Sequence, residues 1–133
     1  DFAHHPTAVR ETITAIKQKY PDHHLIAIFE PRSNTSRTNL FQSEYVQSFL
    51  NADTTLLPQV NQPEKVKNGE VLDVPAIVQE LNKLGGNAHY LPEISNIIEF
   101  LQSQDAKPCV ALIMSNGSFS GLHEKLITNV LNN

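Results

Sequence analysis

The sequence predicts an α/β fold, a Rossmann-like three-layer sandwich with helices on both faces of a mostly parallel sheet. Short apolar runs, typical of buried strands, alternate along the chain with segments whose apolar residues recur every three or four positions, as on one face of a helix. This alternation is typical of a parallel sheet. With 133 residues, 40% of them hydrophobic, the chain is long enough to bury a core, and we expect one domain over residues 1–133.

The first half of the chain predicts two helices and two strands. Apolar residues spaced by four, three and four predict a helix over residues 6–20, and a compact apolar run predicts a strand over 25–29. A second helix is expected to begin near Thr38 or Asn39, and a strand follows over 54–57. The aromatic residues of this second helix lie four apart and are expected in the core: Phe41, Tyr45 and Phe49.

The second half begins with a long polar loop over residues 58–70. Asp73 fits the N-cap of a helix that Gly85 and Gly86 end, as C-terminal glycines commonly do. A short strand over 88–91, a helix from about Ile94 to Leu101 and a strand over 109–114 are expected next. A last helix is predicted from the spacing of its apolar residues, which are Leu122, Leu126, Ile127, Val130 and Leu131.

Composition excludes several classes of protein. A net charge of −4, with ten scattered Lys and Arg residues, argues against a general nucleic-acid binder. The single cysteine, Cys109, lies in an apolar run and is expected to be buried and reduced. No stretch is long enough to cross a membrane, and nothing at the N-terminus resembles a secretion signal, so a cytoplasmic protein without a membrane partner is expected.

Two loops that follow predicted strands carry candidate ligand-binding residues. In parallel sheets, ligands bind beyond the carboxyl ends of the strands. Arg32 and Arg37 follow the first strand, and guanidinium groups bind carboxylates well. Residues 115–121, which are small and include glycine, follow the last strand and would let a ligand approach the backbone. The common phosphate-binding glycine patterns are absent, so the fold alone names no reaction.

The chain opens with Asp1, His4 and His5 just ahead of Pro6, a residue suited to the first turn of a helix. A helix N-terminus offers backbone donors and a positive dipole end, which makes this stretch a candidate site. A solvent-exposed helix start is the simpler interpretation of the two histidines. A zinc site is not expected, because no pair of potential ligands has the spacing of three or four residues that places two side chains on one helix face.

Three motifs together resemble the C-terminal domain of the Mur ligases. They are Asp-Phe-Ala-His-His-Pro-Thr at 1–7, Phe-Glu-Pro-Arg-Ser-Asn-Thr at 29–35 and Met-Ser-Asn-Gly-Ser-Phe-Ser-Gly at 114–121. The resemblance covers essentially the whole chain. Within the family, the second and third motifs resemble the ligases that join a recycled tripeptide, L-alanyl-γ-D-glutamyl-meso-diaminopimelate, to UDP-N-acetylmuramate. The ligases that add L-alanine share the opening motif, but they tend to carry a His-Arg pair after the first strand.

The resemblance implies the third domain of a three-domain enzyme of peptidoglycan recycling and cell wall biogenesis. In that reaction ATP activates the muramyl carboxylate as an acyl phosphate, and the free amine of the peptide attacks it to form an amide. The N-terminal domain would hold UDP-N-acetylmuramate, and the central domain would hold ATP and Mg²⁺. The third domain would bring the peptide, and it would be inactive alone.

The resemblance also implies roles for seven residues, and none of them is a metal ligand. Asp1 matches an aspartate that contacts the nucleotide, and His4 matches a histidine at the reacting centre that can orient the amine or carry its proton. His5 is expected to cap the helix instead. The remaining matches belong to the peptide pocket: Arg32, Arg37, Ser115, Asn116 and Gly117.

Two alternatives stay open at this stage. The first is the C-terminal domain of a ligase that joins L-alanine to UDP-N-acetylmuramate. The second belongs to another class, a stand-alone module that binds a small carboxylate or phosphate without catalysis. Both would keep the predicted fold, and they differ from the tripeptide hypothesis in the ligand.

Overall fold

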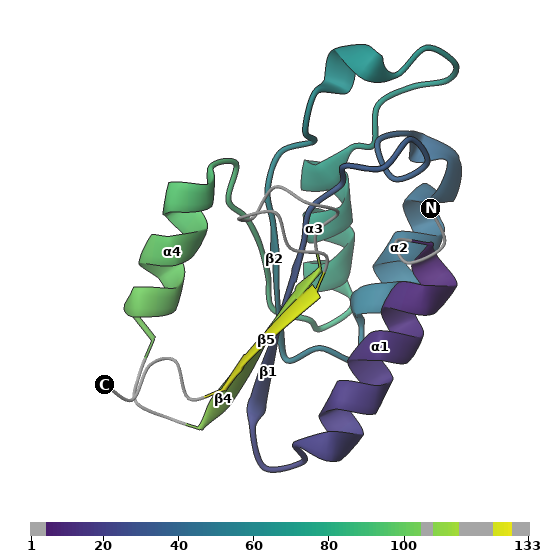
Figure 1. Cartoon of the computed structure of the whole chain (residues 1–133). Coiled ribbons are helices and arrows are strands. Elements are labelled where there is room, and N and C mark those ends of the chain that lie inside the picture. Colours follow the sequence, from purple (N-terminus) through teal and green to yellow (C-terminus); the bar gives the residue numbers. More distant parts are fainter. Residues whose placement is uncertain (1–4, 105–107, 115–123, 129–133) are drawn as a thin grey trace.

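The computed structural model describes residues 5–104 and 108–114, together with the backbone of residues 124–128. A five-stranded sheet in the order β3-β2-β1-β4-β5 forms its centre (Figure 1). The strands are β1 (His24–Phe29), β2 (Thr54–Leu57), β3 (Ala88–Tyr90), β4 (Cys109–Met114) and β5 (Glu124–Thr128). The first four strands run parallel to their neighbours, and β5 pairs with β4 in the antiparallel direction.

Helices cover both faces of this sheet. They are α1 (Pro6–Lys19), α2 (Gln42–Phe49), α3 (Val74–Lys83) and α4 (Ile94–Gln102), with short 3₁₀ turns η2 (Asn39–Phe41) and η3 (Pro63–Lys65). Figure 1 shows α1, α2 and α3 on one side of the strands and α4 on the other. The predicted three-layer α/β sandwich with a mostly parallel sheet is therefore confirmed.

The alternation of side chains along β1 supplies both layers of the core. Leu25 and Phe29 pack with α1, α2 and α3, whereas Ile26 and Ile28 pack with Ile97 of α4. Two of the three aromatic residues expected in the core are confirmed in the larger layer, where Tyr45 and Phe49 are fully buried beside Phe29. The third, Phe41, lies in η2 and is only partly buried against this layer. Burial raises the pKa of the Tyr45 hydroxyl. The thiol of Cys109 is buried in β4, as expected.

The predicted signals at both ends of α3 are confirmed. The Asp73 carboxylate accepts a hydrogen bond of 3.1 Å from the Ala76 amide, which satisfies one of the free N–H groups at the start of the helix. Gly85 ends the helix with φ of 92°, a left-handed conformation that costs glycine little. These local interactions fix the length of the helix and therefore the point at which the chain turns back toward β3.

The predicted last helix is wrong for residues 124–128, which form strand β5. Leu126 and Ile127 pair with Leu112 and Ala111 of β4. The physical reason is the edge of the sheet: without a neighbour, β4 would expose an unpaired row of backbone donors and acceptors next to an apolar strand. The apolar spacing of residues 122–131 carries no information about the unpaired edge of β4, so it predicts a helix instead of a strand. Leu122, Val130 and Leu131 lie outside the described residues.

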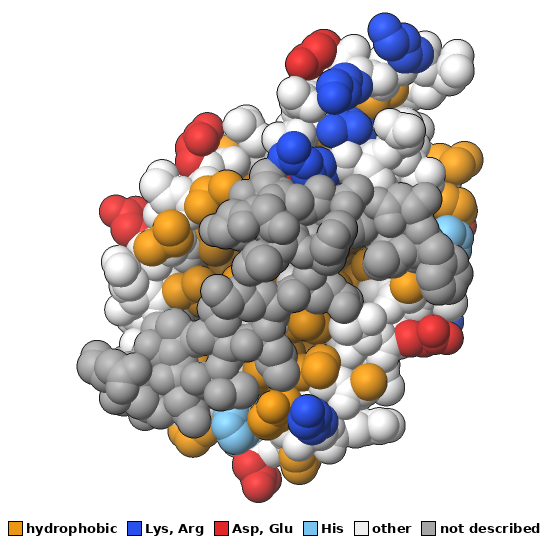
Figure 2. All heavy atoms as spheres, viewed as in Figure 1, with side chains coloured by type: hydrophobic (Ala, Val, Ile, Leu, Met, Phe, Trp, Pro, Cys, Tyr) orange, Lys and Arg blue, Asp and Glu red, His pale blue; other side chains and the backbone are white. Residues whose placement is uncertain are grey.

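The loops at the carboxyl ends of the strands form one end of the molecule. The loop predicted over residues 58–70 is present and contains only the short turn η3. Figure 2 shows that several Lys and Arg side chains gather at this end. Every helix in the described part of the chain is too short or too polar to cross a membrane.

Candidate functional site

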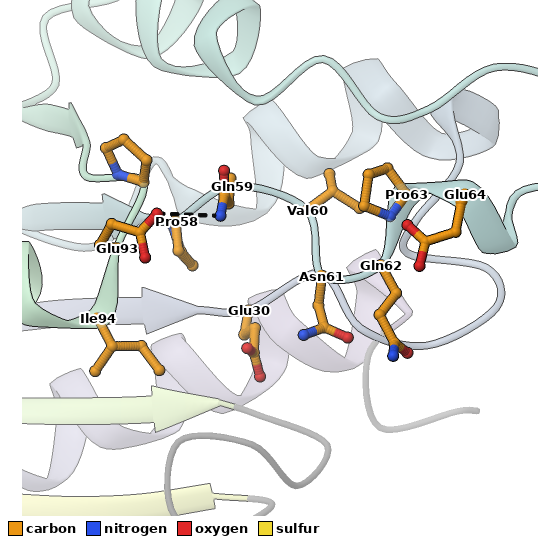
Figure 3. A pocket seen from close by; sticks show the side chains of 11 residues that line it. Glu30, Pro58, Gln59, Val60, Asn61, Gln62, Pro63, Glu64, Glu93 and Ile94 are labelled. Carbon is orange, nitrogen blue, oxygen red and sulfur yellow. Dashed lines mark hydrogen bonds between the residues drawn. The ribbon is translucent and has the colours of Figure 1, made fainter.

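A cavity of about 590 Å³ lies at the carboxyl ends of β1, β2 and β3 (Figure 3). Glu30 reaches it directly after β1, residues 58–64 after β2, and Pro92, Glu93 and Ile94 after β3. Because parallel strands end at the same edge of the sheet, three loops far apart in sequence meet here. This is the position where α/β sheets hold their ligands. The cavity lies at the edge that the strand-end rule predicts, but neither Arg32 nor Arg37, the expected binding residues that the structure describes, is among its lining residues.

The lining of this cavity is acidic and rich in amides. Carboxylates come from Glu30, Glu64 and Glu93, and side-chain amides come from Gln59, Asn61 and Gln62. Neither lysine nor arginine is among the described lining residues. Figure 3 shows the side chains of Glu30, Asn61 and Gln62 extending toward the same side. Carboxylates and amide oxygens accept hydrogen bonds from ammonium groups, so this lining complements an amine better than an anion.

Backbone hydrogen bonds between the loops hold this lining in place. The Glu30 amide donates to the Met114 carbonyl at 3.0 Å, and the Asn61 amide donates to the Pro31 carbonyl at 3.2 Å. The Gln59 side-chain amide donates to the Glu93 carboxylate at 3.3 Å, shown dashed in Figure 3. The Glu30 side chain is only 5% exposed. The cavity is therefore built before any ligand arrives.

The loop between β1 and α2 is locked by its own hydroxyl groups. Ser33 and Ser36 are buried and their hydroxyls form a hydrogen bond of 2.7 Å. The Ser36 amide donates to the Ser33 hydroxyl at 3.0 Å, and the Ser33 amide donates to the Ser36 hydroxyl at 2.9 Å. Short side chains that bond to nearby backbone groups favour a fixed turn over a helix or a strand. This turn fixes the backbone between Arg32 and Arg37.

Arg37 is a buried connector between two loops. Its side chain is 6% exposed, and its Nε donates to the Asn61 carbonyl at 2.6 Å. One terminal nitrogen, Nη2, donates to the Asn61 side-chain oxygen at 3.4 Å. The Arg37 carbonyl also accepts from the Leu72 amide at 2.8 Å. The residue thus ties the loop after β1 to the loop after β2, and it also lines a second cavity on the far side of this link.

Arg32 is in a different situation. Its side chain is half-buried, and within the described residues no hydrogen bond or ion pair engages the guanidinium. An arginine that is positioned by a rigid loop and has no protein partner there can bind a carboxylate of a ligand. The sequence predicts that Arg32 and Arg37 both bind the ligand. In the structure Arg37 connects two loops, whereas Arg32 makes no such connection within the described residues.

At the N-terminal end of α1, His5 caps the helix, as expected. Its Nδ1 accepts a hydrogen bond of 3.2 Å from the Thr7 amide, and its ring packs against Phe41 with centroids 4.7 Å apart. Two predicted site residues near this position, Asp1 and His4, lie outside the described residues. The same holds for three residues of the predicted peptide pocket after β4, which are Ser115, Asn116 and Gly117.

The cavity residues Glu30, Asn61 and Glu93 were not identified as candidates from the sequence. Glu30 is part of the motif at 29–35 and Asn61 is part of the polar loop over 58–70, but the sequence assigned neither residue a role. Their role depends on the pairing of strands that are far apart in sequence. The strand-end rule was the available signal, because each of these residues follows a predicted strand. In the described part of the chain, no three His, Cys, Asp or Glu side chains cluster closely enough to hold a metal ion.

Comparison with known proteins agrees with this geometry. The model of the family described as Mur ligase, glutamate ligase domain, matches residues 1–117. A UDP-N-acetylmuramate–L-alanine ligase of Streptococcus suis is 35% identical, over 100% of this chain and 29% of its own length. The UDP-N-acetylmuramate–L-alanyl-γ-D-glutamyl-meso-2,6-diaminoheptandioate ligase of Haemophilus influenzae is 30% identical, over 96% of this chain and 26% of its own length. The chain thus spans less than a third of these relatives.

Two solved structures share the fold. A murein peptide ligase of Psychrobacter arcticus superposes with a TM-score of 0.69 at 31% identity, over 90% of this chain and 24% of its own. A domain described as part of a UDP-N-acetylmuramate:L-alanyl-γ-D-glutamyl-meso-diaminopimelate ligase of Haemophilus ducreyi gives 0.60 at 28% identity, over 90% of this chain and 78% of its own. The family match over most of the chain, together with this shared fold, shows that the protein belongs to the Mur ligases and is a Mur ligase C-terminal domain.

Proposed function

We propose that this domain binds the amine donor of an amide ligase and that the donor is the tripeptide L-alanyl-γ-D-glutamyl-meso-diaminopimelate. The observation that carries the proposal is the cavity of about 590 Å³ at the carboxyl ends of β1, β2 and β3. A cavity of this size suits a peptide-sized ligand. L-Alanine, whose side chain is a single methyl group, would leave most of it filled with water.

The charges around the site support a peptide with several ionised groups. Carboxylates of Glu30, Glu64 and Glu93 face the cavity and complement the amino groups of the tripeptide. Arg32 has no partner within the described residues and would hold one of the three carboxylates of the tripeptide. The locked turn of Ser33 and Ser36 keeps this arginine in a defined place. L-Alanine offers one amine and one carboxylate, so it would use only part of this arrangement.

The chemistry of the proposed ligase requires positioning more than acid–base catalysis by this domain. The family resemblance implies that ATP converts the muramyl carboxylate to an acyl phosphate, which the peptide amine attacks. Holding the amine in line with that carbon accounts for much of the rate in such a step. In this proposal His4 orients the amine or accepts its proton, Asp1 contacts the nucleotide, and Ser115, Asn116 and Gly117 line the peptide pocket.

Binding of ATP and Mg²⁺ belongs to another domain in this proposal. The chain has no Gly-x-x-x-x-Gly-Lys-Ser/Thr pattern. Its described residues also lack any group of three potential metal ligands. We therefore assign the nucleotide and the metal mainly to a central domain, and the muramyl substrate to an N-terminal domain, of the same enzyme. A domain that supplies only the amine donor is expected to be inactive alone.

A second candidate is the ligase that adds L-alanine. The observation that favours it is the 35% identity to the Streptococcus suis L-alanine ligase over the whole of this chain. Steady-state kinetics of the ligase that contains this chain separate the two, with the tripeptide and L-alanine as competing amine donors. We expect kcat/KM for the tripeptide to exceed that for L-alanine by about a hundredfold or more. A preference for L-alanine would overturn the substrate assignment.

A stand-alone binding module is the alternative from another class. The reading frame upstream of Asp1 separates it from a ligase. Our proposal expects a central domain there with a Gly-x-x-x-x-Gly-Lys-Ser/Thr sequence. A start codon at that point, with no such domain ahead of it, would favour the stand-alone module.

A further inference from the structure

A second cavity, of about 630 Å³, lies on the other side of the link between Arg37 and Asn61. One wall is the loop between β1 and α2, and the other is the segment 65–68, which begins at the last residue of η3. We call it the basic groove, and it is lined by Asn34, Arg37, Thr38, Lys65, Val66, Lys67 and Asn68. Among the described residues its lining carries three cations and no carboxylate, in a chain whose net charge is −4.

The cations of the basic groove have unused hydrogen-bonding capacity. Lys65 and Lys67 are exposed, and neither forms an ion pair or a side-chain hydrogen bond within the described residues. Arg37 is 6% exposed and uses Nε and Nη2 on Asn61, while Nη1 has no partner in the described part of the chain. One fixed guanidinium and two unpaired ammonium groups around a single cavity form an arrangement that suits an anion.

Both walls of the basic groove are held without a ligand. The Asn39 amide donates to the Glu70 carbonyl at 2.8 Å, and the Leu72 amide donates to the Arg37 carbonyl at 2.8 Å. Thr38 and Val71 form an isolated antiparallel bridge between the same two segments. The Thr38 hydroxyl donates to the Thr35 carbonyl at 2.9 Å, which fixes the near wall. These bonds join residues 37–39 to residues 70–72, just beyond the lysine-bearing residues 65–68, and so limit how far that segment can lie from Arg37.

The basic groove and the strand-end cavity have opposite character and share one boundary. Arg37 lines the groove, and Asn61, its hydrogen-bond partner, lines the cavity that contains Glu30 and Glu93. Figure 2 shows several blue side chains gathered at this end, with an acidic side chain close to the uppermost of them. A ligand that extends across this boundary would meet hydrogen-bond acceptors for its ammonium groups on one side and cationic hydrogen-bond donors for its carboxylates on the other.

We infer that the basic groove is a carboxylate subsite, in which Lys65, Lys67 and Arg37 receive the diaminopimelate end of the peptide. The inference rests on the proposed function and extends it to residues of the long loop that no family motif covers. It fixes the direction of the peptide: its carboxylate-bearing end lies in the groove, away from the strand-end cavity. Carboxylates added beyond the tripeptide, as in longer peptides, would lie farther along the same groove.

The test uses the full 133-residue chain and its Lys65→Gln/Lys67→Gln double variant. Calorimetric titration with the tripeptide is expected to show about tenfold weaker binding by the double variant. The difference should shrink as salt is added, because exposed charges are screened. A tripeptide whose diaminopimelate carboxylates are amidated should bind both proteins equally. Lys83→Gln, which removes an exposed lysine of α3 outside the groove lining, is the matched control and should bind like the parent chain.

Unchanged tripeptide affinity in the double variant would overturn the subsite while leaving the proposed function in place. Glutarate, a dicarboxylate without an amine, tests whether the groove binds carboxylates independently of whether the domain binds the tripeptide. Shifts of the backbone amides of residues 65–68 with glutarate, lost in the double variant, would show that the groove binds carboxylates even if the tripeptide failed to bind. In that case the proposed function would be rejected, and with it the assignment of the groove to the diaminopimelate end. No amide shift at residues 65–68 with either ligand would reject the subsite.

Discussion

Arg37 and Asn61 connect the two loops that bound the candidate site. The Nε of Arg37 lies 2.6 Å from the Asn61 carbonyl in a position that is almost inaccessible to solvent. A hydrogen bond from a charged donor contributes more than a neutral one, and losing it leaves a carbonyl without its partner. This contact therefore contributes to the stability of the site as well as to its charge.

We expect Arg37→Ala to lower the free energy of unfolding by about 2 kcal/mol, because the buried contact with Asn61 is lost. Chemical denaturation followed by circular dichroism measures this change. Arg32→Ala is the matched control, and its effect should stay within about 0.5 kcal/mol because its guanidinium has no partner in the described residues. Equal losses in the two variants would contradict the connecting role of Arg37.

Arg32 is predicted to act on the ligand instead. In the ligase that contains this chain, Arg32→Ala should raise KM for the tripeptide about tenfold or more, because a charge-assisted hydrogen bond to a carboxylate is lost. KM for ATP should stay within about a factor of two, since the proposed function assigns ATP to another domain and the chain lacks the Gly-x-x-x-x-Gly-Lys-Ser/Thr pattern. Initial rates at varied tripeptide and varied ATP test both expectations. Equal losses for the two substrates would remove Arg32 from the peptide site.

Asp53 lies at the amino ends of the strands, and its carboxyl group makes the free energy of unfolding depend on pH. Burial by itself would raise the pKa of this carboxyl, but the hydrogen bond from the Leu25 amide, the hydrogen bond and charge of Lys17 and the charge of His24 together hold the pKa below its ordinary value. Its carboxylate lies 2.7 Å from the Lys17 ammonium group. A pKa that is lower in the folded than in the unfolded state stabilises the fold above the unfolded pKa. That contribution is lost as pH falls through the folded value.

Asp53→Asn is therefore expected to destabilise the chain at pH 7 and to lose this effect in acid. The difference in unfolding free energy between the parent chain and the variant should shrink as pH falls below about 4. Urea denaturation at several pH values measures the difference. Glu80→Gln, which replaces an exposed carboxylate of α3, serves as the comparison. A difference that grew toward low pH would contradict the assignment.

At the scale of elements, α3 and β5 show what the sequence can and cannot predict. Asp73 and Gly85 identify the two ends of α3 because capping and a left-handed turn depend on residues next to the helix. The register of β5 depends instead on the open edge of β4, which is set by strand pairing across the chain. The location of the candidate site was predictable from the strand-end rule. The cavity residues Glu30 and Asn61 were not, because their meeting depends on long-range pairing.

Gly85→Ala tests the end of α3. The backbone there has φ of 92°, which strains any residue with a Cβ. We expect the free energy of unfolding to fall by about 1 kcal/mol. Thermal denaturation measures the change, and Lys83→Ala, two residues earlier and exposed, should leave stability nearly unchanged. An equally stable Gly85→Ala variant would show that the helix can end in another way.

In the molecule as a whole, stabilising interactions and candidate ligand-binding residues lie at opposite ends of the strands. The amino ends of the strands carry the bond between Lys17 and Asp53, and the carboxyl ends carry the cavity, Arg32 and the basic groove. Three loops contribute to the carboxyl edge, so the site can present several charges in fixed places. An arrangement of this kind suits a peptide with amines and carboxylates at separate positions better than a single amino acid.

We propose that the carboxyl ends of the strands bind the tripeptide, and an amide chemical-shift titration of the 133-residue chain is the most direct experiment on this binding. With L-alanyl-γ-D-glutamyl-meso-diaminopimelate we expect shifts in residues 30–38 and 59–62. L-Alanine at the same concentration should leave these residues unshifted. If L-alanine shifted the amides of these residues as much as the tripeptide does, tripeptide binding at this site would be contradicted. Tripeptide shifts confined to the amino edge, around Asp53, would contradict it as well.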